Sequence, residues 1–250
     1  YDAVLTFLPD LTWFLYRSTI RLKIQNNKSS DCNSLTPPTD VTGGCKKEGE
    51  KAMKEQAYQV YGYRWVVLGI YGLCTGVIQL MWTTFFSITT ASWQYYGFTD
   101  AAEGENAISL LSIIFMAGMI IVSIPSLIAF EKFGFKKAVG FGVVLTGICA
   151  LLRGLFGDSY TMVLVVTVGF AVAQPFLLNS PGLVAGKWFP ERERATANSV
   201  GLLCSYFGMC VGLLLTPVLL DVGLSIKSML MVYGVIGVIS TILFLVFVKE

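Results

Sequence analysis

Long apolar runs dominate the chain from residue 65 onward, and short polar segments separate them. A helix needs roughly 20 apolar residues to cross the hydrocarbon core of a bilayer, which is about 30 Å thick. A helix also satisfies its backbone hydrogen bonds within a single run, which an isolated strand does not. We therefore predict six transmembrane helices, over about residues 65–92, 107–130, 138–157, 160–186, 195–220 and 228–248.

The first 63 residues follow a different pattern. Residues 1–24 hold a short apolar patch that Pro9 and Asp10 interrupt, and it reads either as an interfacial helix or as a tail. Residues 25–55 are polar and contain proline and glycine pairs, which is typical of a flexible linker. The predicted organisation is an N-terminal cytosolic segment and linker, residues 1–63, followed by a six-helix transmembrane bundle, residues 64–250.

Composition supports a membrane protein and excludes several functional classes. Charged residues make up 14% of the chain, whereas soluble domains average roughly 25%. The net charge of +2 gives no reason to expect a nucleic-acid partner. The chain has no histidine, which removes Ser–His catalytic triads and histidine-ligated metal sites. The predicted class is an all-α polytopic membrane protein that is not an enzyme and has no metal or cofactor.

The orientation follows from the distribution of basic residues. The loops after the second and fourth runs are basic, whereas the alternate loops carry mainly Asp and Glu. Because basic loops stay in the cytosol, we expect both termini there. Arg153 is the single charge within the third run, and we expect its side chain to snorkel toward the outer surface.

A spaced motif lies between the second and third runs. Residues 127–137 read Leu-Ile-Ala-Phe-Glu-Lys-Phe-Gly-Phe-Lys-Lys, which resembles the signature G-x3-D-[RK]-x-G-x-[RK]-[RK] of the major facilitator superfamily. Leu127 stands where the first glycine is expected, and Glu131 replaces the aspartate. A tight turn requires glycine at position 134. The resemblance implies a conformational latch between the two halves of a transporter, formed here by Glu131, Lys132, Gly134, Lys136 and Lys137.

Further segments narrow the resemblance to solute carrier family 49. They are Gln79–Phe85, Tyr95–Phe98, Ala173–Pro175, Asn179–Pro181, Trp188–Ala197 and Ser205–Gly208. The similarity covers about residues 64 to 248 and implies the facilitator fold and transport by alternating access. Some segments are more like the feline leukaemia virus subgroup C receptor-related branch, and others more like the branch of the disrupted in renal carcinoma protein 2.

Polar and aromatic side chains at helical spacing mark a candidate solute site. On the first predicted helix these are Tyr71, Thr75, Gln79, Trp82 and Phe86. Polar groups facing lipid are costly, so this stripe either lines an internal cavity or packs against neighbouring helices. On the fourth, Gln174 and Asn179 flank a proline, which kinks helices where cavities open. Gln174 can instead bond a neighbouring helix.

The family resemblance assigns a substrate class to this site. Trp82 and Gln174 match positions that contact a quaternary ammonium headgroup in the receptor-related branch, and an aromatic face attracts such a cation. We therefore expect a choline-like cation, with Gln79, Tyr71 and Asn179 completing the site. Asn179 and Pro175 fit the other branch, so a vitamin such as pyridoxine stays open as the alternative.

The fifth predicted helix carries small residues on one face. Gly201, Ser205, Gly208 and Gly212 recur at helical spacing, and small residues at this spacing allow two helices to approach closely. We expect this face to serve helix packing rather than to form a site.

The number of helices is half of what the family requires. A complete facilitator has about twelve helices in two six-helix halves, so we read the chain as a fragment. The expected partners are a small solute, the lipid bilayer and the missing C-terminal half, supplied by the same full-length chain or by a second copy. The alternative is a truncated, non-transporting membrane protein that associates with a partner transporter. The expected location is the plasma membrane or the lysosomal or vacuolar membrane.

Overall fold

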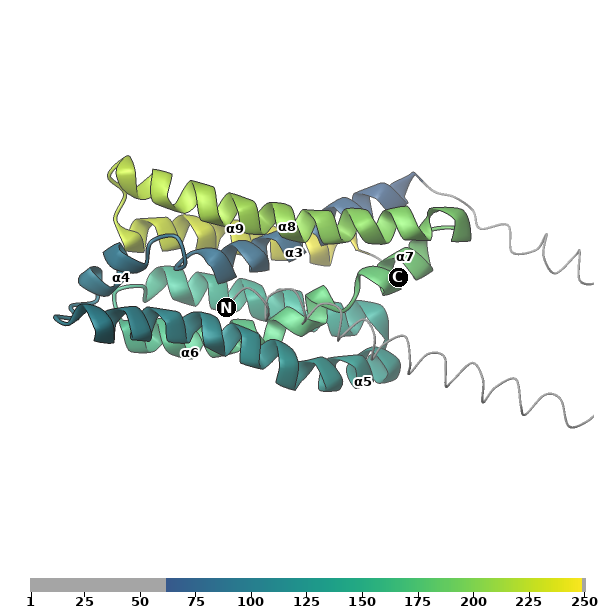
Figure 1. Ribbon diagram of the computed structural model, residues 1–250. Coiled ribbons are helices and arrows are strands. Elements are labelled where there is room, and N and C mark those ends of the chain that lie inside the picture. The colour runs from purple at the N-terminus through teal and green to yellow at the C-terminus, as the bar shows by residue number, and fades with distance from the viewer. Residues whose placement is uncertain (1–61, 249–250) are drawn as a thin grey trace, which may run out of the picture. The chain divides into compact units, whose positions relative to one another are not determined.

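In a computed structural model of the chain, residues 62–248 are described, and the regular structure of these residues is helical. The predicted N-terminal segment, with its apolar patch and linker, lies outside the described residues except for Gly62 and Tyr63. Figure 1 shows the helices running back and forth along one common direction. They are α3 (Tyr63–Thr83), α4 (Thr89–Tyr95), α5 (Ala101–Leu155), α6 (Tyr160–Leu178), α7 (Pro181–Trp188), α8 (Glu191–Asp221) and α9 (Ile226–Phe247).

The helix labelled α5 is folded back at Gly134. Its 55 residues would extend roughly 80 Å as a straight helix, more than twice the thickness of a bilayer core. Gly134 interrupts it with φ 78° and ψ 170°, a conformation that glycine alone adopts at low cost. Five helices in the described part are long and apolar enough to span a membrane, and α5 supplies two passes. The prediction of an all-α polytopic membrane protein is confirmed.

The first expected span corresponds to two helices. α3 ends at Thr83, and α4 begins at Thr89 after a turn. At this end of α3, the Thr84 hydroxyl donates a hydrogen bond to the carbonyl of Leu80 at 2.8 Å. Threonine hydroxyls that bond the preceding turn compete with the helical hydrogen bonds, which is consistent with a helix ending here.

The fourth expected span is also interrupted. α6 ends at Leu178, and α7 restarts at Pro181 after Asn179 and Ser180. Proline suits the first turn of a helix, where its missing N–H costs nothing. The interruption leaves the carbonyl of Leu177 free to accept a hydrogen bond from a side chain of another helix.

α3 is the central helix of the bundle and packs against α8, α9, α5 and α6. Its contact with α8 is very close, because a Cβ atom at Gly208 would lie 2.1 Å from the carbonyl oxygen of Gly76. Glycines at both positions let the two backbones touch. The predicted packing face is confirmed, since all four of its residues are buried: Gly201, Ser205, Gly208 and Gly212.

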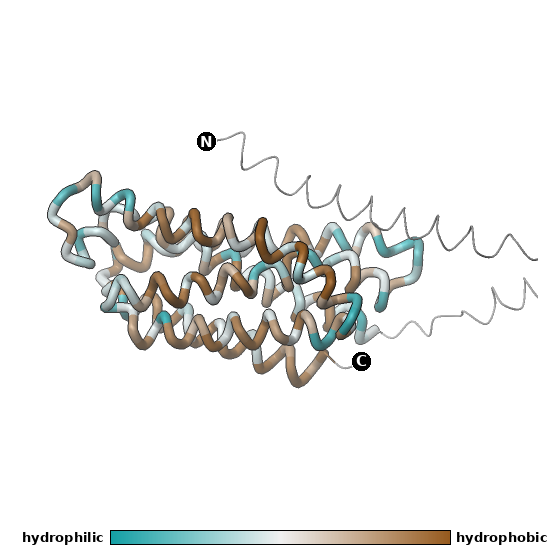
Figure 2. The backbone as a smooth tube through the Cα atoms, turned by 90° about the horizontal axis from the view of Figure 1, so that it is seen from below, coloured by the Kyte–Doolittle hydropathy of each residue, from teal (hydrophilic) through white to brown (hydrophobic). Residues whose placement is uncertain are grey.

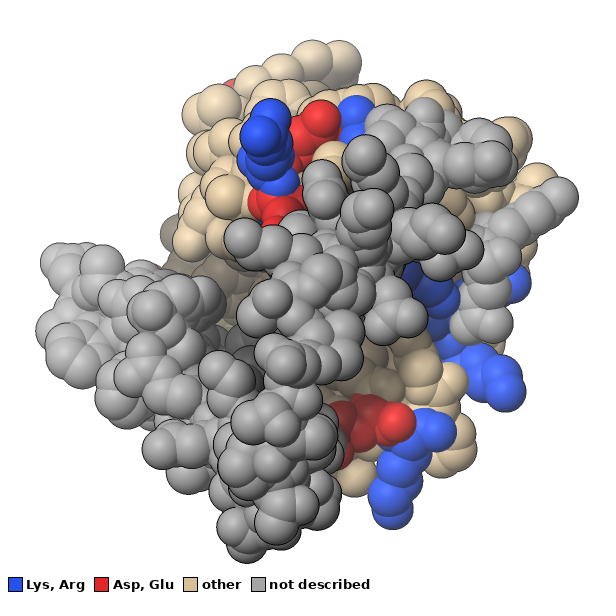
Figure 3. Space-filling view, turned by 90° about the vertical axis from the view of Figure 1, so that its right-hand side faces the viewer, with Lys and Arg blue, Asp and Glu red and all other residues tan. Residues whose placement is uncertain are grey.

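The polar residues gather at the two ends of the bundle. Figure 2 shows hydrophobic residues along the helices and hydrophilic residues mainly near their ends. Figure 3 views one end, where basic side chains outnumber acidic ones among the described atoms. The starts of α3 and α8 meet there through an ion pair of 2.9 Å between Arg64 and Glu193. The basic residues near this end are Arg64, Lys132, Lys136, Lys137, Lys187, Arg192 and Arg194.

Candidate solute-binding site

Two glutamines meet inside the bundle. The Gln174 amide of α6 donates a hydrogen bond to the Gln79 side-chain oxygen of α3 at 3.2 Å. Both side chains are buried, with exposures of 5% and 7%. Helical periodicity predicted that Gln79 faces the interior, and a bond from Gln174 to a neighbouring helix was one of its two predicted roles; the fold brings the two residues together. Their bond uses one donor of Gln174 and leaves its side-chain oxygen buried without a partner.

Trp82 lies next to this pair. It is one turn beyond Gln79 on α3, so the two side chains share a helix face. The Trp82 ring makes an edge-to-face contact with Phe86 at a centroid distance of 6.2 Å. Its indole N–H is buried and also has no hydrogen-bond partner. The Gln174 side-chain oxygen and the Trp82 indole N–H are thus two of several buried polar atoms in the described residues without a hydrogen-bond partner. Buried polar groups of this kind are normally bonded.

Tyr71 occupies the same face of α3, two turns before Gln79. Its side chain is fully buried, and its hydroxyl donates a hydrogen bond to the Leu177 carbonyl at 2.6 Å. The Ser180 hydroxyl donates to the Tyr71 oxygen at 3.1 Å. Tyr71 thus binds the interruption between α6 and α7, where the helix leaves carbonyls free to accept.

Asn179 sits in the interruption itself and faces α5. Its side-chain nitrogen lies 3.3 Å from the Ser123 hydroxyl and 3.2 Å from the Ser126 hydroxyl. Sequence reasoning identified Asn179 but not the two serines, whose signal was their position on either side of Pro125 in an apolar run. The Asn179 amide is bonded in the structure, in contrast to the free oxygen of Gln174.

Arg153 corrects the sequence-based expectation. We expected its side chain to snorkel outward, but it is 2% exposed and points into the bundle. Its guanidinium donates a hydrogen bond to the Met81 carbonyl at 2.8 Å. It also stacks 4.5 Å from the Phe85 ring centroid and 5.6 Å from that of Phe170. The carbonyl near the end of α3 and two aromatic faces replace the water that snorkelling would have provided.

The predicted motif residues surround the reversal in α5. Gly134 lies at the reversal with a φ of 78°, a conformation that favours glycine, and the latch itself stays a prediction. Glu131 and Lys132 precede the reversal and are exposed, and Lys136 and Lys137 follow it. One carboxylate and three basic side chains thus flank the glycine turn.

The family model of the Major Facilitator Superfamily matches residues 71–250. The chain belongs to the major facilitator superfamily.

The relatives of this chain include a member of solute carrier family 49. The chain is 26% identical over 196 residues to solute carrier family 49 member A3 of Xenopus tropicalis, covering 74% of this chain and 40% of that protein. It is 26% identical over 196 residues to the human choline/ethanolamine transporter FLVCR2, covering 75% and 36%. A shorter match, 31% identical over 113 residues, is to the probable anion transporter 3 of Arabidopsis thaliana, covering 44% and 22%.

These matches confirm the resemblance drawn from the sequence. They also show that this facilitator chain spans less than half the length of the curated relatives it matches. Within residues 62–248 no group of three or more Cys, Asp or Glu side chains is arranged to hold a metal ion.

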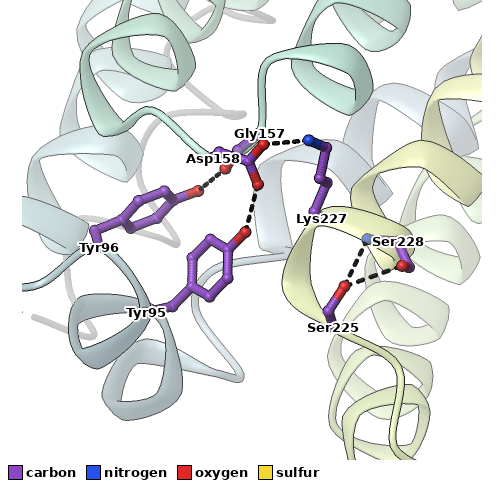
Figure 4. A network of polar contacts seen from close by, with 7 residues as sticks. All are labelled: Tyr95, Tyr96, Gly157, Asp158, Ser225, Lys227 and Ser228. Carbon is purple, nitrogen blue, oxygen red and sulfur yellow. Dashed lines mark hydrogen bonds and ion pairs between the residues drawn. The ribbon is translucent and has the colours of Figure 1, made fainter.

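A polar network that the sequence did not predict joins three segments at the opposite end of the bundle (Figure 4). The Tyr95 hydroxyl of α4 donates to the Asp158 carboxylate at 2.7 Å, and Lys227 of α9 forms an ion pair with the same carboxylate. The neighbouring Tyr96 donates to the Gly157 carbonyl at 3.1 Å.

The bonds to Asp158 shift two pKa values in opposite directions. Those from Lys227 and Tyr95 hold the pKa of Asp158 below its ordinary value, because they stabilise the charged carboxylate. The bond to Asp158 raises the pKa of Tyr95 to about 12, because a phenolate could not donate it.

Proposed function

We propose that the chain is the N-terminal half of a facilitator-type transporter that moves a small organic molecule across a membrane by alternating access. The best candidate solute is a choline-like cation. The proposal rests on one observation: Gln174 and Trp82 keep an acceptor and a donor unpaired inside the bundle, beside the Gln79–Gln174 hydrogen bond. Leaving such groups unpaired costs about 1–3 kcal/mol each, and a bound solute would recover that cost.

The chemistry of the three side chains suits a cation that carries a hydroxyl. The ring of Trp82 offers a π face to a quaternary ammonium group, which needs no carboxylate partner. The free oxygen of Gln174 can accept a hydrogen bond from the hydroxyl, while Gln79 holds the Gln174 amide in place. Tyr71 and Asn179 complete the proposed site on the side of the α6–α7 interruption.

The relatives support the same solute class. FLVCR2 of human and rat is named a choline/ethanolamine transporter, and both align with about three quarters of this chain. Asn179 and Pro175 fit the other branch of the family, and they favour a vitamin such as pyridoxine as the second candidate.

Alternating access requires a second six-helix half, from the same full-length chain or from a second copy. We propose that Glu131, Lys132, Gly134, Lys136 and Lys137 form the latch against that half. The basic end of the bundle then faces the cytosol, with both termini there, in the plasma membrane or in a lysosomal or vacuolar membrane. The spans contain no Asp or Glu, so this half supplies no carboxylate for proton coupling. With no nucleophile paired to a base in the spans, we assign no enzymatic activity.

The test is uptake of radiolabelled choline into cells that express the natural full-length product. Trp82→Ala should abolish uptake while the amount at the membrane stays unchanged. Trp65→Ala is the matched control, because Trp65 is at the other end of the same helix and is 46% exposed. Unchanged uptake by Trp82→Ala would remove Trp82 from the site.

The alternatives give different results in the same assay. Competition of choline uptake by excess unlabelled pyridoxine, or uptake of pyridoxine alone, favours the vitamin. If the wild-type product transports neither solute and instead copurifies with another transporter, the chain is a non-transporting partner.

A further inference from the structure

A groove opens between the second pass of α5 and the end of α9, at the basic end of the bundle. It has a volume of about 440 Å³. Its lining residues come from two short stretches, one after the Gly134 reversal and one in the last turns of α9. They are Lys136, Lys137, Gly140, Phe141, Val144, Phe244, Leu245 and Val248.

The chemistry of this groove changes along its length. Lys136 and Lys137 provide positive charge at one end, and the remaining six lining residues are apolar or glycine. Phe141 and Leu245 on its walls are 52% and 54% exposed. Exposed apolar walls do not match a soluble peptide or a nucleotide. An amphiphile matches both the basic end and the apolar walls of the groove.

The dimensions of the groove match one leaflet of a bilayer. Lys136 and Val144 are eight positions apart on a helix that rises 1.5 Å per residue, so the groove extends roughly 12 Å along α5. One leaflet contributes about half of the 30 Å hydrocarbon core. The lysines therefore lie at the headgroup level when the apolar walls lie beside the first part of an acyl chain.

Gly140 keeps the groove open. A Cβ atom at this position would have one neighbour within 4 Å, the Phe244 ring carbon Cε1 at 3.9 Å. The Phe244 ring is thus the single neighbour within ordinary contact distance of this position, and a branched side chain there would fill the groove without clashing with a backbone.

We propose that this groove binds one anionic phospholipid. The phosphate and carboxylate of the headgroup contact Lys136 and Lys137, and an acyl chain lies over Gly140 between Phe141 and Leu245. Two basic residues attract an anionic headgroup, and the apolar walls accept the chain without exposing it to water. This inference concerns a surface apart from the proposed solute site, and it shares Lys136 and Lys137 with the proposed latch. Lipid retention is measured without transport, so it can fail independently of the proposed function.

The experiment measures lipid retained by the purified full chain. The protein is exchanged into nanodiscs of phosphatidylcholine that contain a small fraction of phosphatidylserine, and native mass spectrometry counts the bound lipids after release. The wild type should retain phosphatidylserine in preference to phosphatidylcholine. Each Lys→Gln change should weaken that preference about 5-fold, and the double change K136Q/K137Q about 25-fold.

Matched variants separate the groove from general surface charge. Lys132→Gln removes the same charge on the other side of Gly134 and should have little effect. Gly140→Leu should abolish retention with both lysines present, whereas Gly69→Leu, at a position with no atoms within 4 Å of a Cβ, should not.

Three outcomes with the variants would overturn the proposal. They are equal retention by the double lysine variant, an equal loss in Lys132→Gln, or unchanged retention in Gly140→Leu. Glycerophosphoserine, which has the headgroup without acyl chains, should not displace the bound lipid. Displacement by it would assign the lysines to free phosphate compounds and would also contradict a lipid site.

Discussion

The Arg153 guanidinium donates a hydrogen bond to the Met81 carbonyl at 2.8 Å, and this bond joins the second pass of α5 to the end of α3. A helix end leaves carbonyls unpaired, and a cation there also interacts favourably with the helix dipole. The Phe85 and Phe170 rings on either side shield the charge. A charged side chain in a membrane span is thereby used to fix the position of α3, the helix that carries Gln79 and Trp82.

Replacing Arg153 should destabilise the bundle. Arg153→Ala removes the bond to Met81 and the two aromatic contacts, which together contribute about 2–4 kcal/mol. The melting temperature of the protein in detergent should fall. Arg153→Lys keeps the charge and one donor, and should lose less. A higher melting temperature in Arg153→Met would show that burying the guanidinium costs more than its contacts return.

The Gln79–Gln174 bond should matter more for solute affinity than for stability. Hydrogen bonds between membrane helices contribute about 0.6 kcal/mol on average, so Gln174→Leu should shift the melting temperature only slightly. Choline uptake should fall more than 10-fold, mainly through a higher KM, because the free oxygen of Gln174 is lost.

Asn179→Leu provides the comparison, since its amide already bonds Ser123 and Ser126. It should lower the melting temperature more than Gln174→Leu does. A larger effect of Gln174→Leu on stability than on uptake would assign Gln174 to helix packing.

The Asp158 network should give a stability contribution that is constant around neutral pH. The pKa of Asp158 is lowered by folding, so its contribution is complete above the ordinary value of 3.8 and is lost as the pH falls further. The pKa of Tyr95 is raised from 10.0 to about 12, so its contribution is complete below pH 10 and is lost between pH 10 and 12.

Comparing Asp158→Asn with the wild type tests the acidic and the alkaline pH limits of this contribution. The difference in melting temperature should stay level from about pH 5 to pH 9, and it should shrink at more acidic and more alkaline pH. Tyr95→Phe should reduce the alkaline change and also weaken the acidic one, because the Tyr95 hydroxyl is one of the two groups that lower the pKa of Asp158. A difference that varies steadily between pH 5 and 9 would mean that another group controls this end of the bundle.

The close packing of Gly76 and Gly208 predicts that no side chain larger than that of glycine fits at position 208. A methyl group at Gly208 would lie 2.1 Å from the Gly76 carbonyl oxygen, so Gly208→Ala should force α3 and α8 apart and cost about 1–3 kcal/mol. Gly69→Ala on α3 is the control, because its new Cβ has no neighbour within 4 Å. Thermal unfolding of both variants in detergent measures the effect, and equal stability of the two would contradict the close contact.

Much of the fold could be predicted from local sequence. Run length gave the passes, because the bilayer thickness sets how many apolar residues a span needs. Gly134 could be assigned to the reversal because its conformation excludes other residues, and the small face of α8 because small side chains at helical spacing leave room for a neighbour. Each of these properties depends on a single segment and its surroundings.

For the candidate site, the sequence could predict which side of a helix faces the interior but not which side chains meet there. Periodicity placed Gln79 and Trp82 toward the interior, and Gln174 was singled out by its position beside Pro175. Whether Gln174 bonds Gln79 depends on which helices are neighbours and on their relative height. The same holds for Arg153. The sequence alone indicated a side chain that points outward, because the helix that carries Arg153 contains no partner for it. Its partners, Met81, Phe85 and Phe170, come from other helices.

The sequence by itself thus determined the membrane class, the passes and their reversal points, since these follow from hydropathy and backbone conformation within one segment. Only the tertiary structure decided which polar atoms were paired across helices and which stayed free, because hydrogen bonds of about 3 Å depend on the relative height and rotation of two helices.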